Sequence, residues 1–316
     1  MRKLVVLDGY ALNPGDMDWT LLEAFGDLTV YDRTQEEDVL KRIGDAEIVF
    51  TNKTILTKEI INQAPKLKYI GVLATGYNVV DVEAAREKDV VVTNIPSYST
   101  NAVAQFTFAL LLEITNRVQR HSDAVIEDNR WATSKDFCFW DYPLIELAHK
   151  KMGIIGYGTI GRAVGRIAKA FDIEVLAYSP SLDPNDPDWA SLPTIYKESD
   201  IITLHLPLTE KSREMINKDI IAQMKDGVII LNTSRGPLIN EQDLADALNT
   251  NKVYAAGVDV VSVEPILEEN PLLNAKNIII TPHIAWAPKQ TRERLLGIAA
   301  KNVAGFLAGK VVNRVG

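Results

Sequence analysis

The first hundred residues alternate short apolar runs with amphipathic stretches of helical period. The apolar runs predict strands at Leu4–Leu7, Leu28–Tyr31, Glu47–Phe50, Tyr69–Val72 and Val90–Val92, and the amphipathic stretches predict helices at Glu36–Ile43, Thr57–Gln63 and Val82–Lys88. Strand–helix alternation of this kind is typical of a parallel sheet with helices on both faces.

A second alternating series begins at Lys151, after a long apolar stretch that predicts a helix at Asn101–Arg117. This series predicts strands at Met152–Ile155, Glu174–Tyr178, Ile201–His205, Val228–Asn232, Ala255–Val258 and Ile278–Ile280, and helices at Thr159–Phe171, Lys218–Gln223, Glu241–Leu248 and Lys289–Ala308. The two series indicate two doubly wound α/β domains of unequal size. Because the long helices near 101–117 and 289–308 can carry the chain between them, we expect the C-terminus to return to the first domain.

The segment 119–149 fits neither series. It is rich in aromatic residues, and its apolar positions follow no clean period. We interpret it as an arm or an interface segment.

Composition narrows the possible partners and compartments. The 316 residues are 47% hydrophobic, which is enough for two domains of roughly 100–200 residues each. A net charge of −8 argues against nucleic acid or an anionic membrane as the main partner. The single cysteine, Cys138, excludes an intrachain disulfide and fits a reducing compartment. The N-terminus lacks a signal-peptide pattern and no long apolar span is present, so the sequence predicts a cytoplasmic protein.

The most specific motif is the glycine-rich run Gly156–Gly161, with the sequence GYGTIG. It follows a predicted strand and opens a predicted helix, the context in which G-x-G-x-x-G binds a dinucleotide. Gly156 would make the tight turn, Gly158 would admit the diphosphate, and Gly161 would let helix and strand pack closely. Thr159 and Ile160 would lie at the helix N-terminus, whose N–H groups and dipole favour an anion.

The choice between NAD and NADP stays open. The strand Glu174–Tyr178 ends at Ser179, where an acid that binds the ribose hydroxyls of NAD is expected. Ser179 can bond a ribose but repels no 2′-phosphate, and the following residues LDPNDPD offer no Arg or Lys to receive one. We therefore expect NAD, with NADP as the alternative.

Three segments that follow predicted strands carry candidate chemistry: NTSRG at 232–236, VDVVSVEP at 258–265 and TPHIAW at 281–286. Ligands of open α/β sheets bind outside the carboxyl ends of the strands, so Arg235, Glu264 and His283 are expected to converge there. His283 can donate a proton to a carbonyl oxygen or accept one from a hydroxyl. Glu264 can bond the other ring nitrogen, and Arg235 can hold a carboxylate with paired donors.

These segments resemble the D-isomer-specific 2-hydroxyacid dehydrogenase family over nearly the whole chain. The runs VLDGYALNPGD at 6–16, LATGYNVVD at 73–81, FCFW at 137–140 and HIAW at 283–286 look most like its glycerate dehydrogenase/hydroxypyruvate reductase branch. The resemblance implies a Rossmann dinucleotide-binding domain at 100–285, with a dimerisation arm near 119–149. It also implies a flavodoxin-like substrate domain at 1–99, completed by 286–316.

The resemblance further implies hydride transfer between the cofactor and a small D-2-hydroxy or 2-oxo acid in a cytoplasmic homodimer, with no metal. It makes Arg235, Glu264 and His283 catalytic and places Thr233, Ser234 and Asp259 on the cofactor. The implied substrate residues are Asn52, Leu73, Ala74, Thr75, Gly76, Trp140 and Trp286. A Thr-Gly turn can aim N–H groups at a carboxylate, and Trp140 has interface packing as its alternative role.

Two functional alternatives remain. One is a non-catalytic NAD(H)-sensing protein on the same fold, because fold alone does not decide function. The other is a D-lactate-type dehydrogenase, since the volume of the substrate pocket is not encoded in any motif. The remaining histidines, His121, His149 and His205, are interpreted as structural.

Overall fold

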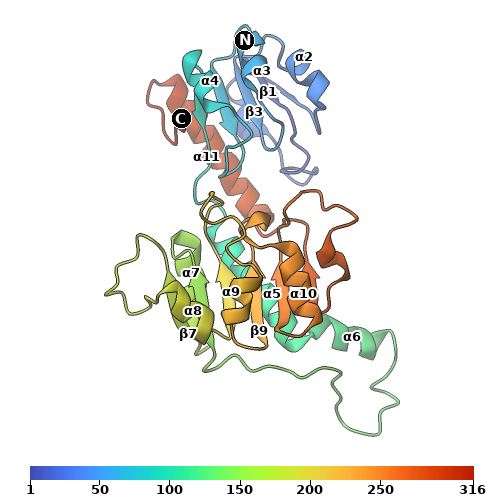
Figure 1. Ribbon diagram of the computed structural model, residues 1–316. Coiled ribbons are helices and arrows are strands. Elements are labelled where there is room, and N and C mark those ends of the chain that lie inside the picture. The colour runs from blue at the N-terminus through green and yellow to red at the C-terminus, as the bar shows by residue number, and fades with distance from the viewer. The chain divides into compact units, whose positions relative to one another are not determined.

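The computed structural model describes all 316 residues. The chain divides into two compact units, and each is described here by itself. Unit 1 consists of Met1–Ser99 together with Trp286–Gly316, and unit 2 consists of Thr100–Ala285 (Figure 1).

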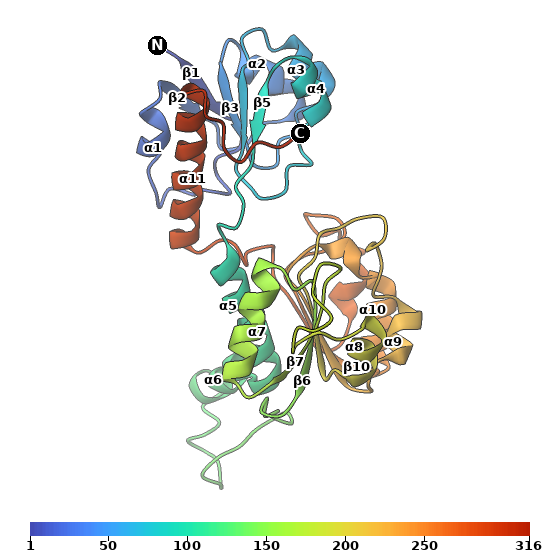
Figure 2. The ribbon, with the colours of Figure 1, turned by 90° about the vertical axis from the view of Figure 1, so that its left-hand side faces the viewer.

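Unit 1 is a five-stranded parallel sheet with the strand order β2-β1-β3-β4-β5. Its elements are β1 (Lys3–Val6), α1 (Thr20–Glu23), β2 (Asp27–Val30), η1 (Glu36–Asp38), α2 (Val39–Ile43), β3 (Ile48–Thr51), α3 (Lys58–Gln63), β4 (Tyr69–Val72), α4 (Val82–Glu87), β5 (Val91–Thr93) and α11 (Lys289–Leu307). The C-terminal helix α11 packs with α1 on one face, and α2, α3 and α4 cover the other (Figure 2).

Alternation along the strands of unit 1 supplies both faces of its sheet. In β3, Val49 joins the cluster beneath α2, α3 and α4, whereas Ile48 and Phe50 join the cluster beneath α1 and α11. All three side chains are fully buried. A strand buried on both faces has to be continuously apolar, which explains the run that predicted it.

Unit 2 is a six-stranded parallel sheet with the order β11-β10-β9-β8-β6-β7. Its elements are α5 (Thr100–Asn116), α6 (Val118–Ile126), β6 (Lys151–Ile155), α7 (Thr159–Ala170), β7 (Glu174–Tyr178), α8 (Leu192–Glu198), β8 (Ile201–Leu204), α9 (Lys218–Gln223), β9 (Val228–Asn232), η2 (Gly236–Leu238), α10 (Glu241–Asn249), β10 (Val253–Val258), η3 (Pro271–Asn274) and β11 (Ile278–Ile280). Helices α5 and α7 lie on one face, and α8, α9 and α10 lie on the other (Figure 2).

The two parallel-sheet units confirm the predicted fold class. Every predicted strand is present within two residues of its expected bounds. The sequence pattern missed the short helices α1, α6 and α8. Helix α6 has only four apolar residues, of which Ala124 is buried while Val118 and Ile126 are exposed, so few apolar positions mark it in the sequence. No helix of the structure is both long and apolar enough to cross a bilayer.

Candidate active site

The glycine-rich loop joins β6 to α7 at the carboxyl edge of the unit 2 sheet. Gly156 has φ +98°, and a Cβ there would lie 2.3 Å from the carbonyl oxygen of His205. A Cβ on Gly161 would lie 2.1 Å from the Gly156 carbonyl oxygen. A Cβ on Gly158, by contrast, would meet nothing within 4 Å. Packing therefore requires the outer two glycines, while the middle one leaves open space above the helix.

That open space lies at the N-terminus of α7. Gly158 is the N-cap residue and supplies no side-chain acceptor to the N–H groups of the first turn. Thr159 is exposed and Ile160 half-buried at this end. Uncapped N–H groups and the helix dipole together favour an anion, so the loop fits the diphosphate of a dinucleotide.

A network of charged groups organises the loop after Ser179. The Tyr157 hydroxyl donates to Asp188 at 2.6 Å, and Lys169 pairs with the same carboxylate at 2.7 Å. Burial, reinforced by the bond to Asp188, raises the pKa of the Tyr157 phenol. Arg162 of α7 pairs with Asp186 at 3.6 Å. The sequence pattern missed Arg162 as a cation near this loop, because it precedes Ser179 by one strand and one helix.

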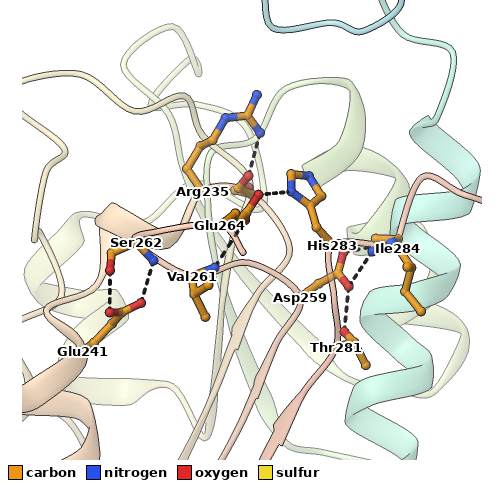
Figure 3. Close-up of polar contacts among 11 residues, drawn as sticks. Arg235, Glu241, Asp259, Val261, Ser262, Glu264, Thr281, His283 and Ile284 are labelled. Atoms are coloured by element: carbon orange, nitrogen blue, oxygen red, sulfur yellow. Dashed lines mark hydrogen bonds and ion pairs between the residues drawn. The ribbon is translucent and has the colours of Figure 1, made fainter. Parts of the chain in front are cut away.

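Arg235, Glu264 and His283 follow β9, β10 and β11, which are neighbours in the sheet. His283 Nδ1 and Glu264 Oε2 are 2.7 Å apart (Figure 3). The other Glu264 oxygen accepts a longer bond, of 3.4 Å, from the Val261 N–H. Because Glu264 bonds Nδ1, the Nε2 atom of His283 is left to meet a substrate.

The His283 segment is held by Asp259, the residue directly after β10. Asp259 is only 1% exposed, and its carboxylate accepts bonds from the Thr281 hydroxyl at 2.6 Å, the Ile284 N–H at 2.9 Å and the Ala285 N–H at 2.8 Å. Burial raises the pKa of Asp259, and these bonds oppose the rise. His283 itself has φ +56°, a conformation that needs such support. The sequence assigned Asp259 only to the cofactor and missed this contact set.

Arg235 lies exposed at the start of the turn η2. One guanidinium nitrogen donates to the Ser234 carbonyl at 2.6 Å, and the Asn232 side chain donates to the Arg235 carbonyl at 2.9 Å. Figure 3 shows Arg235 and His283 projecting from their loops on the same side. Most guanidinium donors therefore remain available to a ligand.

The other cofactor candidates of this edge contact the protein interior. Thr233 is buried, and its hydroxyl lies 3.2 Å from that of Thr107 on α5. The Ser234 hydroxyl donates to the Leu204 carbonyl at 2.7 Å, which ties the end of β9 to the end of β8. These bonds fix the edge on which the cofactor candidates lie.

In unit 1, the candidate substrate residues follow β3 and β4. Asn52 is 6% exposed, and its amide donates to the carbonyl of the fully buried Leu73 at 3.0 Å. The Thr75 hydroxyl donates to the Ile95 carbonyl at 2.8 Å, while Ala74 accepts the Ile95 N–H. The Thr75 and Gly76 N–H groups have no acceptor in the protein. The turn is thus fixed by its neighbours and keeps donors free.

The two candidate tryptophans have different surroundings. Trp140 is 62% exposed in the segment 119–149, and Trp286 is half-buried against the α1/α11 cluster of unit 1. Of the other histidines, His121 bonds the backbone at both ring nitrogens. His205 bonds Thr203 through Nε2, whereas its buried Nδ1 has no partner. Burial lowers the pKa of His205 to about 3.

The chain is similar in sequence to known proteins over nearly its whole length. The family model described as "D-isomer specific 2-hydroxyacid dehydrogenase, NAD binding domain" matches residues 108–285. A hydroxypyruvate reductase of Blautia hydrogenotrophica is 56% identical over 320 residues, covering 99% of each chain. A glycerate dehydrogenase of Methylorubrum extorquens is 36% identical, also over 99% of each chain.

A solved structure resembles the fold as well. The D-lactate dehydrogenase of Aquifex aeolicus, complexed with NAD and lactic acid, superposes with a TM-score of 0.79 at 29% identity. The alignment covers 98% of this chain and 96% of that one.

Proposed function

The chain belongs to the D-isomer-specific 2-hydroxyacid dehydrogenase family, and on this premise we propose that it interconverts hydroxypyruvate and D-glycerate, with NADH as its preferred reductant. As a member it is an oxidoreductase that binds NAD and transfers a hydride between this cofactor and a small 2-hydroxy or 2-oxo acid. The substrate choice is supported by the names of the two relatives that match over their full length.

The cofactor is proposed to bind along the carboxyl edge of the unit 2 sheet. Gly156, Gly158, Thr159, Ile160 and Gly161 would hold its diphosphate at the start of α7. Ser179 would bond the adenosine ribose, and Thr233, Ser234 and Asp259 would line the nicotinamide end. When bound, the reduced nicotinamide supplies the hydride. Asp183, which pairs with no cation, supports the preference for NADH because its charge disfavours a 2′-phosphate. Asp186 and Asp188 add less to this preference, because they pair with Arg162 and Lys169.

The proposed chemistry is a proton transfer at His283 Nε2. In reduction the protonated ring donates this proton to the carbonyl oxygen, on which negative charge builds, and in oxidation the neutral ring removes it. Glu264 fixes the ring through Nδ1 and stabilises its charged form. Arg235 binds the substrate carboxylate and polarises the carbonyl with its paired donors. The observation that carries the proposal is the 2.7 Å bond between Glu264 and His283. These two residues follow β10 and β11, and β10 is the neighbour of β9, the strand that precedes Arg235.

In unit 1, the N–H groups of Thr75 and Gly76 are proposed to bind an anionic group of the substrate. The absence of a protein acceptor for these donors supports the assignment, and the Asn52–Leu73 bond would hold the turn in place. Ala74 would contribute backbone to the same turn. Trp140 and Trp286 would supply apolar walls.

We also propose a cytoplasmic homodimer formed through the segment 119–149. Phe137 is 88% exposed there, beside the exposed Trp131 and Trp140, an unusual amount of apolar surface for one segment. The single cysteine is consistent with a reducing compartment. Light scattering of the purified protein measures the assembly; a monomeric mass would contradict this part.

The function is tested with a substrate panel of hydroxypyruvate, glyoxylate, pyruvate and phenylpyruvate, each with NADH and with NADPH. We expect the highest kcat/KM for hydroxypyruvate with NADH, and product of the D configuration. A higher kcat/KM for pyruvate would contradict hydroxypyruvate as the proposed substrate, but not hydride transfer to a 2-oxo acid. A higher value with NADPH would contradict the cofactor preference.

A further inference from the structure

Glu241, the first residue of α10, reaches the loop that carries Glu264. Its carboxylate accepts the Ser262 N–H at 2.6 Å and the Ser262 hydroxyl at 2.6 Å (Figure 3). The Asn270 side chain also donates to it, at 3.0 Å. Hydrogen bonds to an ionised carboxylate are roughly twice as strong as neutral ones, so three of them make a firm anchor.

The anchored loop contributes little packing of its own. Val260 and Val261 are buried next to β10, but Ser262, Val263 and Glu264 are exposed. The Glu264 carboxylate accepts a long bond of 3.4 Å from the Val261 N–H and bonds His283 at 2.7 Å. Ser262 is a second point at which this exposed stretch is bonded to the rest of unit 2, and its partner there is Glu241.

The same loop touches the turn that presents Arg235. A Cβ on Gly236 would lie 1.9 Å from the Val261 carbonyl carbon and 2.4 Å from the Ser262 nitrogen. The backbones after Arg235 and before Glu264 are thus in direct contact, and only glycine permits it. Glu241 follows Gly236 by five residues and binds the same loop.

We propose that Glu241 is a positioning residue: by binding Ser262 it holds the Val261–Glu264 loop against the Arg235 turn and places Glu264 on His283 Nδ1. The inference deepens the proposed function and rests on it, because Glu264 and His283 are the residues to which that function assigns the proton transfer.

A purely structural role gives a different expectation. An acidic residue in the first turn stabilises a helix through its dipole, and Glu241 occupies that place in α10. Removing such an interaction lowers stability while the folded enzyme keeps its turnover. A positioning role instead lowers kcat in fully folded protein, because displaced catalytic groups lose reactive geometry.

The test compares Glu241→Ala with the wild-type protein, using hydroxypyruvate and NADH well below the melting temperature. We expect kcat to fall roughly 10- to 100-fold, with unchanged NADH affinity in a fluorescence titration. Glu241→Gln keeps one carbonyl acceptor for Ser262 and should recover part of the loss. Ser262→Ala removes one of the two loop bonds and should lower kcat less. The kcat of the double variant, with Glu241→Ala and Ser262→Ala, should be no lower than that of Glu241→Ala alone, because both substitutions remove the same Glu241–Ser262 contact.

Asp246→Ala is the matched control, since it removes another carboxylate from α10 whose side chain bonds only Gln242. It should leave kcat unchanged. Nitrogen-15 NMR of labelled histidine supplies a readout that needs no substrate: the His283 Nδ1–H signal, identified with a His283 variant, should weaken or broaden in Glu241→Ala. An unchanged signal, or unchanged kcat with only a lower melting temperature, would overturn the inference. If the wild-type protein reduced none of the 2-oxo acids while the signal responded, the proposed function would fail and the positioning role would stand.

Discussion

The two units are both open parallel sheets, yet they differ at the carboxyl end of their first strand. In unit 1, β1 is followed by Asp8, whose carboxylate accepts the N–H groups of Asn52, Lys53 and Thr54 at 2.6–2.8 Å. In unit 2, β6 is followed by the loop at Gly156–Gly161 and by the uncapped N-terminus of α7. One unit fills this position with its own anion, and the other leaves it open.

The difference bears on where each sheet is proposed to bind its ligand. Ligands of doubly wound sheets bind where the strand order reverses, which is between β1 and β3 in unit 1 and between β6 and β8 in unit 2. Asp8 accepts the backbone N–H groups at the reversal between β1 and β3, so these donors are not available to a diphosphate. Free donors in unit 1 occur one strand further, at Thr75 and Gly76. The two units are therefore proposed to bind their ligands at different strands.

The largest expected effect comes from His283→Ala, which removes the proposed general acid of unit 2. We expect kcat for hydroxypyruvate to fall by about 10²- to 10⁴-fold, the usual contribution of a general acid. NADH affinity should be nearly intact, because the proposed diphosphate site follows β6 whereas His283 follows β11. Stopped-flow reduction and a fluorescence titration measure the two quantities separately.

The control for this change is His149→Asn, which removes an exposed imidazole of the same unit at a positive φ that Asn tolerates. Its kcat should match the wild-type value. Comparable losses in both variants would mean that His283 has no special role.

The next effect tests the open position itself. Gly158→Val introduces a side chain where nothing lies within 4 Å, so the protein should fold with little change in melting temperature. The added atoms would occupy the space assigned to the diphosphate, and we expect NADH to bind about 10-fold more weakly or worse. Gly297→Ala, another glycine with open surroundings, is the control in unit 1. Normal NADH affinity in Gly158→Val would place the cofactor elsewhere.

Much of the fold could be predicted from the sequence because the central strands are buried on both faces. Val228–Asn232 and Tyr69–Val72 are buried at every position and have the bounds that their apolar runs indicate. Arg235, Glu264 and His283 could also be predicted as candidate site residues, since each follows a predicted strand. Their catalytic roles remain predictions, although the bond between Glu264 and His283 is present.

What the sequence could not predict depends on contacts between distant residues. Glu241 meets Ser262 across 21 positions, and Asp259 meets Thr281 across 22. Nothing local marks either carboxylate as an anchor, because each resembles an ordinary helix-start or strand-end acid. Arg162 was missed for the same reason: its partner Asp186 lies beyond the next strand.

A smaller effect tests the filled position of unit 1. Asp8→Ala leaves three backbone N–H groups without their acceptor, and we expect the free energy of unfolding to fall by about 1–3 kcal/mol. Water reaches this half-buried site, which favours the lower end of that range. NADH affinity should be unaffected. Urea unfolding measures this change in free energy. Weakened NADH binding in a fully folded variant would contradict the proposal that the Asp8 position of unit 1 takes no part in cofactor binding.

The smallest effect concerns His205, whose backbone packs against Gly156 beneath the open position. Burial lowers its pKa in the folded protein to about 3, from the ordinary value of 6.5. Between these values the unfolded chain binds a proton that the folded chain excludes, so stability falls as pH decreases from 6.5, by at most about 1.4 kcal/mol per pH unit. His205→Asn, which can still bond Thr203, should lose less stability between pH 7 and pH 5 in urea unfolding. If His205→Asn kept the wild-type pH dependence, the imidazole would be protonated in the folded protein, and the β8 edge beneath the phosphate loop would carry a positive charge.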